Sequence, residues 1–341
     1  MQFGYWLPVF GGWLRNVEDE GMETSWSYVK RLVQRSEEIG FDLTLIAELF
    51  LNDIKGESAP SLDAWSTAAA LAAVTEKLEL MVAVRPTFHN PAILAKQAAN
   101  IAHISGDRLS LNVVSSWWQE EARQYGIHFE QHDDRYARMK EWLDVVTNLW
   151  EKDHYSLNGN YYQVSNTILQ PKPVKKPMLY AGGESEAGKN LIAQTCDGYV
   201  MHGDAPEAIG KRITDMRIRR DKLGLPPMKF GVAAYSIVRN SNQEVKKELE
   251  RITNINASAA GYNNYQQWIN GTQLEKKVSL EDYSVSNRGL RTGLTGTPEK
   301  IAEQIDAFEK AGVDFFLLQC SPQLEEMERF AEAIIAYQPS R

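Results

Sequence analysis

Met178-Leu-Tyr-Ala-Gly-Gly-Glu-Ser-Glu-Ala-Gly188 passes from a short apolar segment, through a pair of glycines, into a run typical of a helix. Gly182 and Gly183 allow the backbone to turn tightly and to approach a ligand closely. Ser185 stands where the helix would begin, and a helix N-terminus offers unpaired N–H groups and partial positive charge to a phosphate. The stretch predicts a strand, a turn and a helix. The turn is either a phosphate cradle or a plain connection whose glycines serve geometry alone.

The same order of a short apolar run and an amphipathic run recurs along most of the chain. Expected strands cover residues 2–7, 42–47, 78–84, 108–114, 178–181, 198–201, 229–238 and 315–319. Expected helices cover residues 25–39, 61–75, 92–104, 134–150 and a stretch that begins near Pro298. Alternation at this spacing implies right-handed crossovers and a parallel sheet, and eight units predict an α/β fold, a TIM-type (β/α)8 barrel. An open doubly wound sheet is the competitor, but no Gly-x-Gly-x-x-Gly follows the first strand.

Two segments interrupt this rhythm within what we expect to be one domain over residues 1–341. Residues 158–177 contain Asn-Gly-Asn and three prolines, which predicts an inserted hairpin followed by an extended linker. Residues 258–291 are polar, contain several glycines, and lie between the seventh strand and the next helix. Long excursions on this side of a barrel are often lids, so we expect a lid-like insertion here.

Composition narrows the class of partner. The 341 residues carry a formal net charge of −8, which argues against nucleic-acid binding because a basic face is expected there. No apolar run approaches the length that spans a bilayer, and the first residues lack the features of a signal peptide. The two cysteines, Cys196 and Cys320, are too few for a disulfide scaffold. We therefore expect a cytoplasmic protein with no membrane partner.

Unusual residues follow the fourth expected strand, where a barrel has its active-site face. Asn112 lies near the end of that strand, and Trp117 and Trp118 come shortly after it. The tryptophans either stack on a flat aromatic ligand or serve as a cap and a rim of the barrel. Arg135 and Tyr136 stand at the start of a helix, where the forked donors of arginine suit a phosphate. The alternative is an ordinary helix start with an aspartate cap and solvated charges.

The residue pattern gives little support to catalysis by a metal site or by a nucleophilic side chain. The six histidines are scattered without metal-ligand spacing, so we expect no metal site. No Gly-x-Ser-x-Gly elbow is present, and Cys320 is either a nucleophile or, more in keeping with its apolar surroundings, a packed thiol. The roles of His89 and His202 stay open between structure and catalysis. A phosphate cradle without these groups suggests that a cofactor carries the reaction, and flavin mononucleotide (FMN) fits.

Several motifs together resemble the bacterial luciferase-like, flavin-dependent monooxygenases over nearly the whole chain. They are Asn112-Val-Val-Ser, His132-Asp-Asp-Arg-Tyr136, Ala181-Gly-Gly-Glu-Ser185, Gly40-Phe-Asp, Ala83-Val-Arg-Pro86, Pro91-Ala-Ile-Leu-Ala-Lys-Gln-Ala98 and Gly296-Thr-Pro-Glu299. The resemblance implies a TIM-type barrel that uses reduced FMN and O2 as co-substrate. It also implies a separate NAD(P)H-dependent flavin reductase as partner and a homodimer or homotetramer.

The resemblance also implies site residues. Positions that hold the flavin in similar members are occupied here by Asn112, Glu121, Arg135, Tyr136 and Ser185. By the turn argument, Gly183 and Glu184 flank the phosphate.

Within the family, Ser284-Val-Ser-Asn-Arg-Gly-Leu-Arg291 and the run from Ser321 to Ala331 resemble the dimethyl sulfone branch more than the alkanesulfonate branch. The alkanesulfonate enzymes carry ionisable or hydrogen-bonding groups at positions that are here Ser61, Ala233, Tyr235, Ser321 and Gln323. Without those groups a sulfonate would be poorly held, so a small neutral sulfone is preferred. We expect catalytic roles for Ser61 and for Arg288 or Arg291.

The sequence therefore predicts a two-component monooxygenase that oxidises a small organosulfur compound, similar to dimethyl sulfone or an alkanesulfonate, in sulfur metabolism. Two alternatives stay open. A deazaflavin (F420)-dependent oxidoreductase on the same barrel would transfer hydride without oxygen. A non-catalytic FMN-binding protein would bind the cofactor without turnover.

Overall fold

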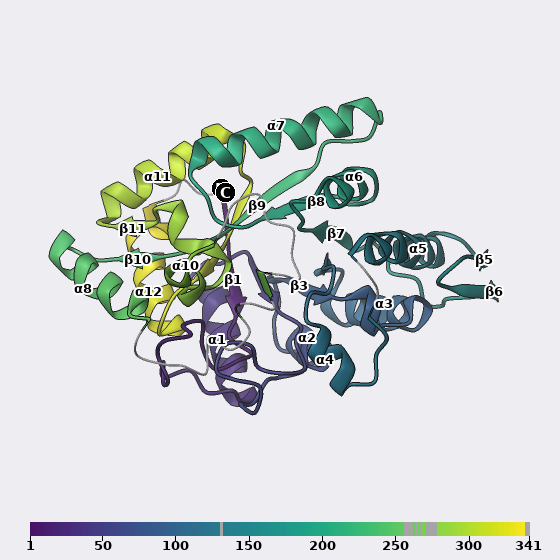
Figure 1. The fold of residues 1–341 in the computed structure, drawn as a ribbon, viewed down its shortest axis with the longest axis horizontal. Coiled ribbons are helices and arrows are strands. Elements are labelled where there is room, and N and C mark those ends of the chain that lie inside the picture. The colour runs from purple at the N-terminus through teal and green to yellow at the C-terminus, as the bar shows by residue number, and fades with distance from the viewer. Residues whose placement is uncertain (130–131, 256–261, 263–264, 266–267, 270–277, 338–341) are drawn as a thin grey trace.

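The computed structural model describes residues 1–129, 132–255, 262, 265, 268–269 and 278–337. Eight parallel strands close into a barrel in the order β1-β12-β9-β8-β7-β4-β3-β2, with helices outside it (Figure 1). The barrel strands are β1 (Gln2–Leu7), β2 (Leu43–Ile46), β3 (Glu79–Val84), β4 (Leu109–Val113), β7 (Met178–Ala181), β8 (Gly198–Met201), β9 (Lys229–Tyr235) and β12 (Phe315–Gln319). The (β/α)8 prediction is confirmed, and an open doubly wound sheet is excluded.

The helices begin and end at ordinary capping signals. The Ser25 side chain accepts a hydrogen bond from the Tyr28 backbone nitrogen, and Gly106, at φ 66°, ends the helix that Asn90 begins. The α-helices are α1 (Trp26–Glu38), α2 (Ala64–Ala72), α3 (Pro91–Ser105), α4 (Gln119–Gln124), α5 (His132–Glu151), α6 (Glu186–Thr195), α7 (Pro206–Lys222), α8 (Asn242–Thr253), α10 (Leu280–Ser284), α11 (Pro298–Ala311) and α12 (Gln323–Ala333). Short 3-10 helices are η1 (Pro86–Phe88), η3 (Ser286–Thr292) and η4 (Ile335–Tyr337). None of the helices in these described ranges is both long and apolar enough to cross a membrane.

The barrel interior changes character along the strands. Its apolar filling consists of Leu43, Leu45, Met81, Tyr180, Val200, Phe315 and Leu317. Toward the carboxyl ends, the next positions are small or polar: Ala83 pairs with Asn112, and Ala233 lies beside Leu317 of the filling. Because these side chains do not fill the barrel, space is left at this end of the sheet.

Two predicted boundaries shift. The inserted hairpin begins earlier than expected, with β5 (Tyr155–Asn158) antiparallel to β6 (Gln163–Thr167), and Glu141 accepts backbone hydrogen bonds from its turn. The seventh expected strand does not run on to residue 238. The chain leaves the barrel after β9, and β10 (Ile237–Val238) pairs with β11 (Thr295–Gly296) instead.

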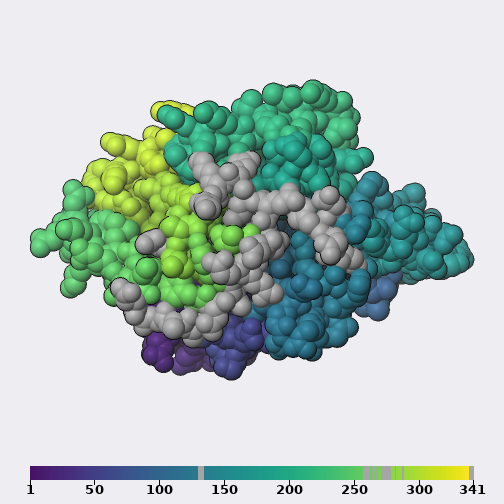
Figure 2. Space-filling view, viewed as in Figure 1, coloured from purple at the N-terminus to yellow at the C-terminus, as the bar shows by residue number. Residues whose placement is uncertain are grey.

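About half of the expected lid-like insertion at 258–291 falls outside the described residues. Its described end contains α10 and most of η3, and Leu14 forms an isolated bridge with Val285. In the space-filling view the green surface around α10 lies between the purple and blue N-terminal part and the teal part with α6 and α7 (Figure 2). This end of the insertion therefore packs against the loop that follows β1.

Candidate functional site

A cavity of about 310 Å³ opens at the carboxyl ends of the barrel strands. Its lining comes from the barrel strands and the loops after them, between Trp6 and Ala233, and from the insertion. It includes Trp6, Phe10, Trp13, Arg15, Glu48, Asp53, Ala83, Arg85, Asn112, Trp117, Arg135, Tyr136, Gly182, Gly183, Glu184, His202, Ala233, Asp282, Tyr283 and Arg288. The cavity lies on the face where a TIM-type barrel carries its chemistry.

In the turn after β7, the backbone lies very close to the backbone of β8. A Cβ atom at Gly182 would lie 2.8 Å from the Val200 carbonyl oxygen, so only glycine fits without movement. The Gly183 carbonyl accepts a hydrogen bond from the Tyr199 hydroxyl at 2.7 Å. Ser185 caps α6 and accepts from the Gly188 nitrogen at 3.1 Å. The predicted strand, turn and helix are confirmed, and both glycines line the cavity.

The start of α5 packs against this turn. The Tyr136 hydroxyl lies 3.1 Å from the position that a Cβ atom of Gly183 would take. Arg135 is 7% exposed, and its guanidinium carbon stands 4.8 Å from the centre of the Phe129 ring. The structure thus brings Arg135 and Tyr136 into the same cavity as Gly183 and Glu184, which are far from them in the sequence.

Two further predicted residues present polar atoms to the same cavity. Asn112 is 6% exposed, and its side-chain oxygen has no hydrogen-bond partner in the described part of the chain. Arg288 is 2% exposed, forms an ion pair with Glu184, and has two other guanidinium nitrogens, Nε and Nη1, without a partner among the same residues. Buried polar atoms of this kind are usually satisfied, which points to a ligand.

The remaining predicted site residues do not line the cavity. Glu121 is fully buried and accepts hydrogen bonds from Arg85 and from the Phe50 nitrogen. The Ser61 hydroxyl donates to the Phe50 carbonyl at 3.0 Å. Arg291 is ion-paired with Asp282, and that hydrogen bond raises the pKa of its guanidinium. Ser185 is engaged as a helix cap, as described above. These side chains act at a distance from the space that a ligand would enter.

Arg85 follows directly after β3 and is a cavity residue for which no role was predicted. Its backbone nitrogen and Nε donate to Glu48 at 3.0 and 3.3 Å, and its Nη1 donates to Glu121. Its Nη2 has no partner among the residues that the structure describes. The guanidinium carbon also lies 3.9 Å from the centre of the Phe88 ring. Arg85 is therefore held at the cavity wall by Glu48 and Glu121, and its Nη2 nitrogen is left to meet a ligand. Its place after a strand was the signal that could have found it.

Of the positions compared with the alkanesulfonate branch, Ala233 lines the cavity and four do not. Those four are Ser61, Tyr235, Ser321 and Gln323. Burial raises the pKa of the Tyr235 hydroxyl well above its ordinary value. Because Ala233 is the position of these that lines the cavity, the wall carries no charged side chain at this point.

The residues whose roles were open now have locations. Cys320 is 3% exposed and off the cavity, and burial raises the pKa of its thiol well above its ordinary value. A nucleophilic role is not supported, because the thiolate is the reactive form.

The two histidines differ in location: His89 pairs with Glu48 at 2.6 Å, whereas His202 lines the cavity. Trp117 lines the cavity and stacks on the buried Trp118, with ring centres 5.5 Å apart. No cluster suited to a metal ion occurs among the residues with described positions.

Comparisons with known proteins agree with this geometry. A family model described as "Luciferase-like monooxygenase" matches residues 1–314. An FMNH2-dependent dimethylsulfone monooxygenase of Pseudomonas fluorescens (strain Pf0-1) is 31% identical, covering 98% of this chain and 93% of its own. A long-chain alkane monooxygenase superimposes with a TM-score of 0.84 at 21% identity, over 98% of this chain and 90% of its own. An F420-dependent secondary alcohol dehydrogenase superimposes with a TM-score of 0.75 at 20% identity, over 99% of both chains.

Proposed function

This chain belongs to the luciferase-like monooxygenase family, and we propose that it is a two-component monooxygenase that uses reduced FMN and O2 to oxidise a small, neutral organosulfur compound of the dimethyl sulfone type. A separate NAD(P)H-dependent flavin reductase would supply the reduced FMN. The same proposal includes a cytoplasmic homodimer or homotetramer, which follows from the resemblance and the cysteine content alone.

The observation that carries the proposal is a glycine turn before a helix N-terminus together with buried polar atoms that lack partners among the described residues, all in one cavity. Gly182 and Gly183 allow close approach at the N-terminus of α6, beside Tyr136, and Arg135 lines the same cavity. The Asn112 oxygen and the Arg85 Nη2 are buried without partners among the described residues. One phosphate and one polar, flat ring system are the features of FMN, so the residues present fit this cofactor.

Roles follow for the residues around the cavity. Arg135, Tyr136 and the Gly182–Gly183 turn would hold the phosphate, while Asn112 and Arg85 would meet polar edges of the ring. Reduced FMN, when bound, supplies the two electrons and the ring on which oxygen is activated. Glu121 and Ser185 become positioning residues in this proposal, since Glu121 orients Arg85 and Ser185 begins α6. Ser61 has the same kind of role through its bond to the Phe50 carbonyl.

The charges around the cavity favour a neutral substrate. Arginines that line it are held in ion pairs: Arg15 with Asp53, Arg85 with Glu48 and Glu121, and Arg288 with Glu184. A sulfonate in a largely desolvated pocket needs an uncompensated cation, since burying an unpaired anion is costly. Arg288 keeps two unpartnered nitrogens among the described residues, so it would serve as a donor toward charge that develops during the reaction.

The fold is shared with an F420-dependent enzyme and does not separate the two functions, so an experiment must do so. The purified protein is titrated with FMN and with F420, and oxygen uptake is followed with each reduced cofactor plus dimethyl sulfone. The proposal expects tight FMN binding and substrate-dependent oxygen uptake with reduced FMN. Hydride transfer from reduced F420 without oxygen uptake would favour the alternative, and FMN binding without any turnover would favour a non-catalytic protein.

A further inference from the structure

The far end of the cavity from the glycine turn is aromatic. In the closed barrel, three strands separate β1 from β7 in either direction, so the loop after β1 lies across the barrel from Gly182. That loop contributes Phe10 and Trp13 to the cavity, and β1 itself contributes Trp6. With the flavin phosphate at the β7 side, this aromatic end is the space left for a substrate.

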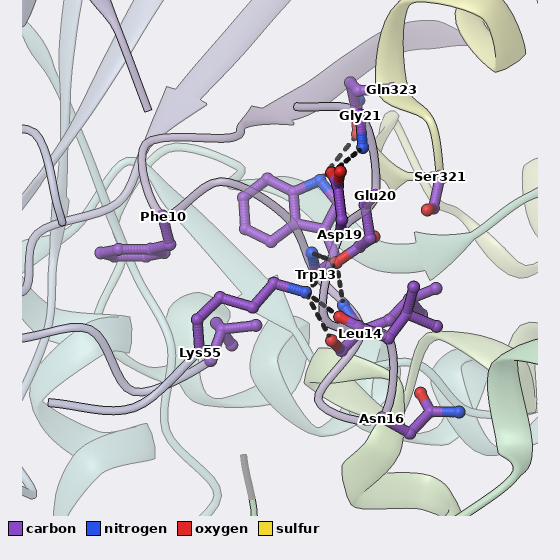
Figure 3. Close-up of polar contacts among 12 residues, drawn as sticks. Phe10, Trp13, Leu14, Asn16, Asp19, Glu20, Gly21, Lys55, Ser321 and Gln323 are labelled. Carbon is purple, nitrogen blue, oxygen red and sulfur yellow. Dashed lines mark hydrogen bonds and ion pairs between the residues drawn. The ribbon is translucent and has the colours of Figure 1, made fainter. Parts of the chain in front are cut away.

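Trp13 is fixed from several directions. Its backbone nitrogen donates to Glu20 at 2.8 Å, and its indole nitrogen donates to the Gln323 side-chain oxygen at 2.7 Å (Figure 3). Its ring packs edge-on against Trp6, with centres 6.3 Å apart and planes at 75°. Trp13 is 1% exposed, so the indole has little freedom to move.

Both partners of Trp13 are themselves held. The Glu20 oxygen that accepts from Trp13 also accepts from the Leu14 nitrogen at 2.9 Å and pairs with Lys55 at 2.6 Å (Figure 3). Gln323 is fully buried at the start of α12, and its amide nitrogen donates to the Met327 sulfur at 3.3 Å. The bond between Trp13 and Gln323 therefore ties the first loop of the chain to its last α-helix.

From this arrangement we propose that Trp13, positioned by Gln323, sets the upper size of the substrate. The inference rests on the proposed function and adds the alkyl-chain limit to it. A compound with one-carbon groups fits beside the indole, whereas longer alkyl groups need the volume that the indole occupies. Since the wall is rigid and closely packed, it excludes extra methylene groups and does not adapt to them.

The test compares kcat/KM for dimethyl, diethyl, dipropyl and dibutyl sulfone with reduced FMN in wild-type and variant proteins. Trp13→Ala removes the wall, Trp13→Phe shortens it, and Gln323→Met frees the indole at similar volume. Trp150→Phe is the matched control, because this buried indole also donates to a neutral oxygen, that of Ala95, but lies off the cavity. FMN affinity, measured by fluorescence quenching, verifies that each variant keeps its cofactor site.

We expect the ratio of kcat/KM for dibutyl sulfone to that for dimethyl sulfone to rise at least about tenfold in Trp13→Ala. Smaller rises are expected in Trp13→Phe and Gln323→Met, and none in Trp150→Phe. If Trp13→Ala does not fold, the two milder variants carry the test. An unchanged ratio in folded variants that still oxidise dimethyl sulfone would overturn the size limit and leave the proposed function intact. Wild-type protein that oxidises no sulfone of any length would contradict the proposed function and remove the basis of this inference.

Discussion

Arg288 and Glu184 form a buried ion pair that joins η3 to the turn after β7 across 104 positions of sequence. Arg288 adopts a left-handed backbone conformation at φ 55°, and its side chain is 2% exposed. The neighbouring Arg291 does not line the cavity and pairs with Asp282, which does. Of the two arginines expected to serve the reaction, we propose Arg288 for this role, because it lines the cavity and Arg291 does not.

Conservative substitutions separate the two arginines. Arg288→Lys keeps the charge toward Glu184 but removes the fork with its two unpartnered nitrogens, so kcat/KM is expected to fall roughly 10- to 100-fold. Arg291→Lys changes a partly exposed pair away from the cavity lining, and we expect an effect below about threefold. Steady-state kinetics with reduced FMN measures both. Equal losses in the two variants would contradict a cavity role that is particular to Arg288.

Arg135 is expected to bind the flavin phosphate. Arg135→Ala should weaken FMN binding by about 1.5–3 kcal/mol, because a buried phosphate loses a charge-assisted donor. The control is Arg138→Ala, one turn further along α5, where the guanidinium lies near the Tyr161 and Tyr162 rings. Fluorescence titration compares the two proteins. Unchanged affinity in Arg135→Ala would make Arg135 an ordinary residue of the helix start.

The tight turn gives a prediction on stability. In Gly182→Ala the new methyl group would meet the Val200 carbonyl oxygen at 2.8 Å, so the turn must shift. We expect a loss of about 1–3 kcal/mol in the free energy of unfolding, with weaker FMN binding. Gly183→Ala is the milder comparison, since its methyl group would meet the Tyr136 hydroxyl at 3.1 Å. Urea denaturation ranks the two, and a larger loss for Gly183→Ala would contradict the geometry.

A buried thiol predicts a pH dependence of stability. Burial raises the pKa of Cys196 from its ordinary value of 9.0 to about 12. The unfolded thiol thus ionises before the folded one, so its contribution to stability is complete below pH 9.0 and is lost as the pH rises toward about 12. The free energy of unfolding should fall by up to about 1.4 kcal/mol per pH unit in that window. Cys196→Ala should show a shallower slope, and identical slopes would contradict the prediction.

Local sequence patterns were sufficient to predict the barrel. The expected strands at 2–7, 178–181, 198–201 and 315–319 match β1, β7, β8 and β12, because short buried strands between turn signals are defined by neighbouring residues. The seventh strand was drawn too long, since apolar Ile237 and Val238 continue its pattern. Only the pairing with β11, far along the chain, shows that they leave the barrel.

The site was predictable where a residue follows a strand or begins a helix. Asn112, Arg135 and Gly183, expected on this ground, line the cavity, and the same rule points to Arg85. Trp13 carried no such signal, because its role depends on Gln323, 310 positions away. The role of Glu121 toward the flavin, which the resemblance implies, stays a prediction: its side chain does not line the cavity, and its carboxylate accepts from Arg85 and a backbone nitrogen.

The most direct test of the account compares product release from three substrates under saturating reduced FMN: dimethyl sulfone, methanesulfonate and octanesulfonate. Because the cavity arginines Arg15, Arg85 and Arg288 are ion-paired and its β1 end is closed by Trp13, we predict sulfinate from dimethyl sulfone and little sulfite from either sulfonate. Efficient release of sulfite from octanesulfonate, with no sulfinate from dimethyl sulfone, would contradict the account.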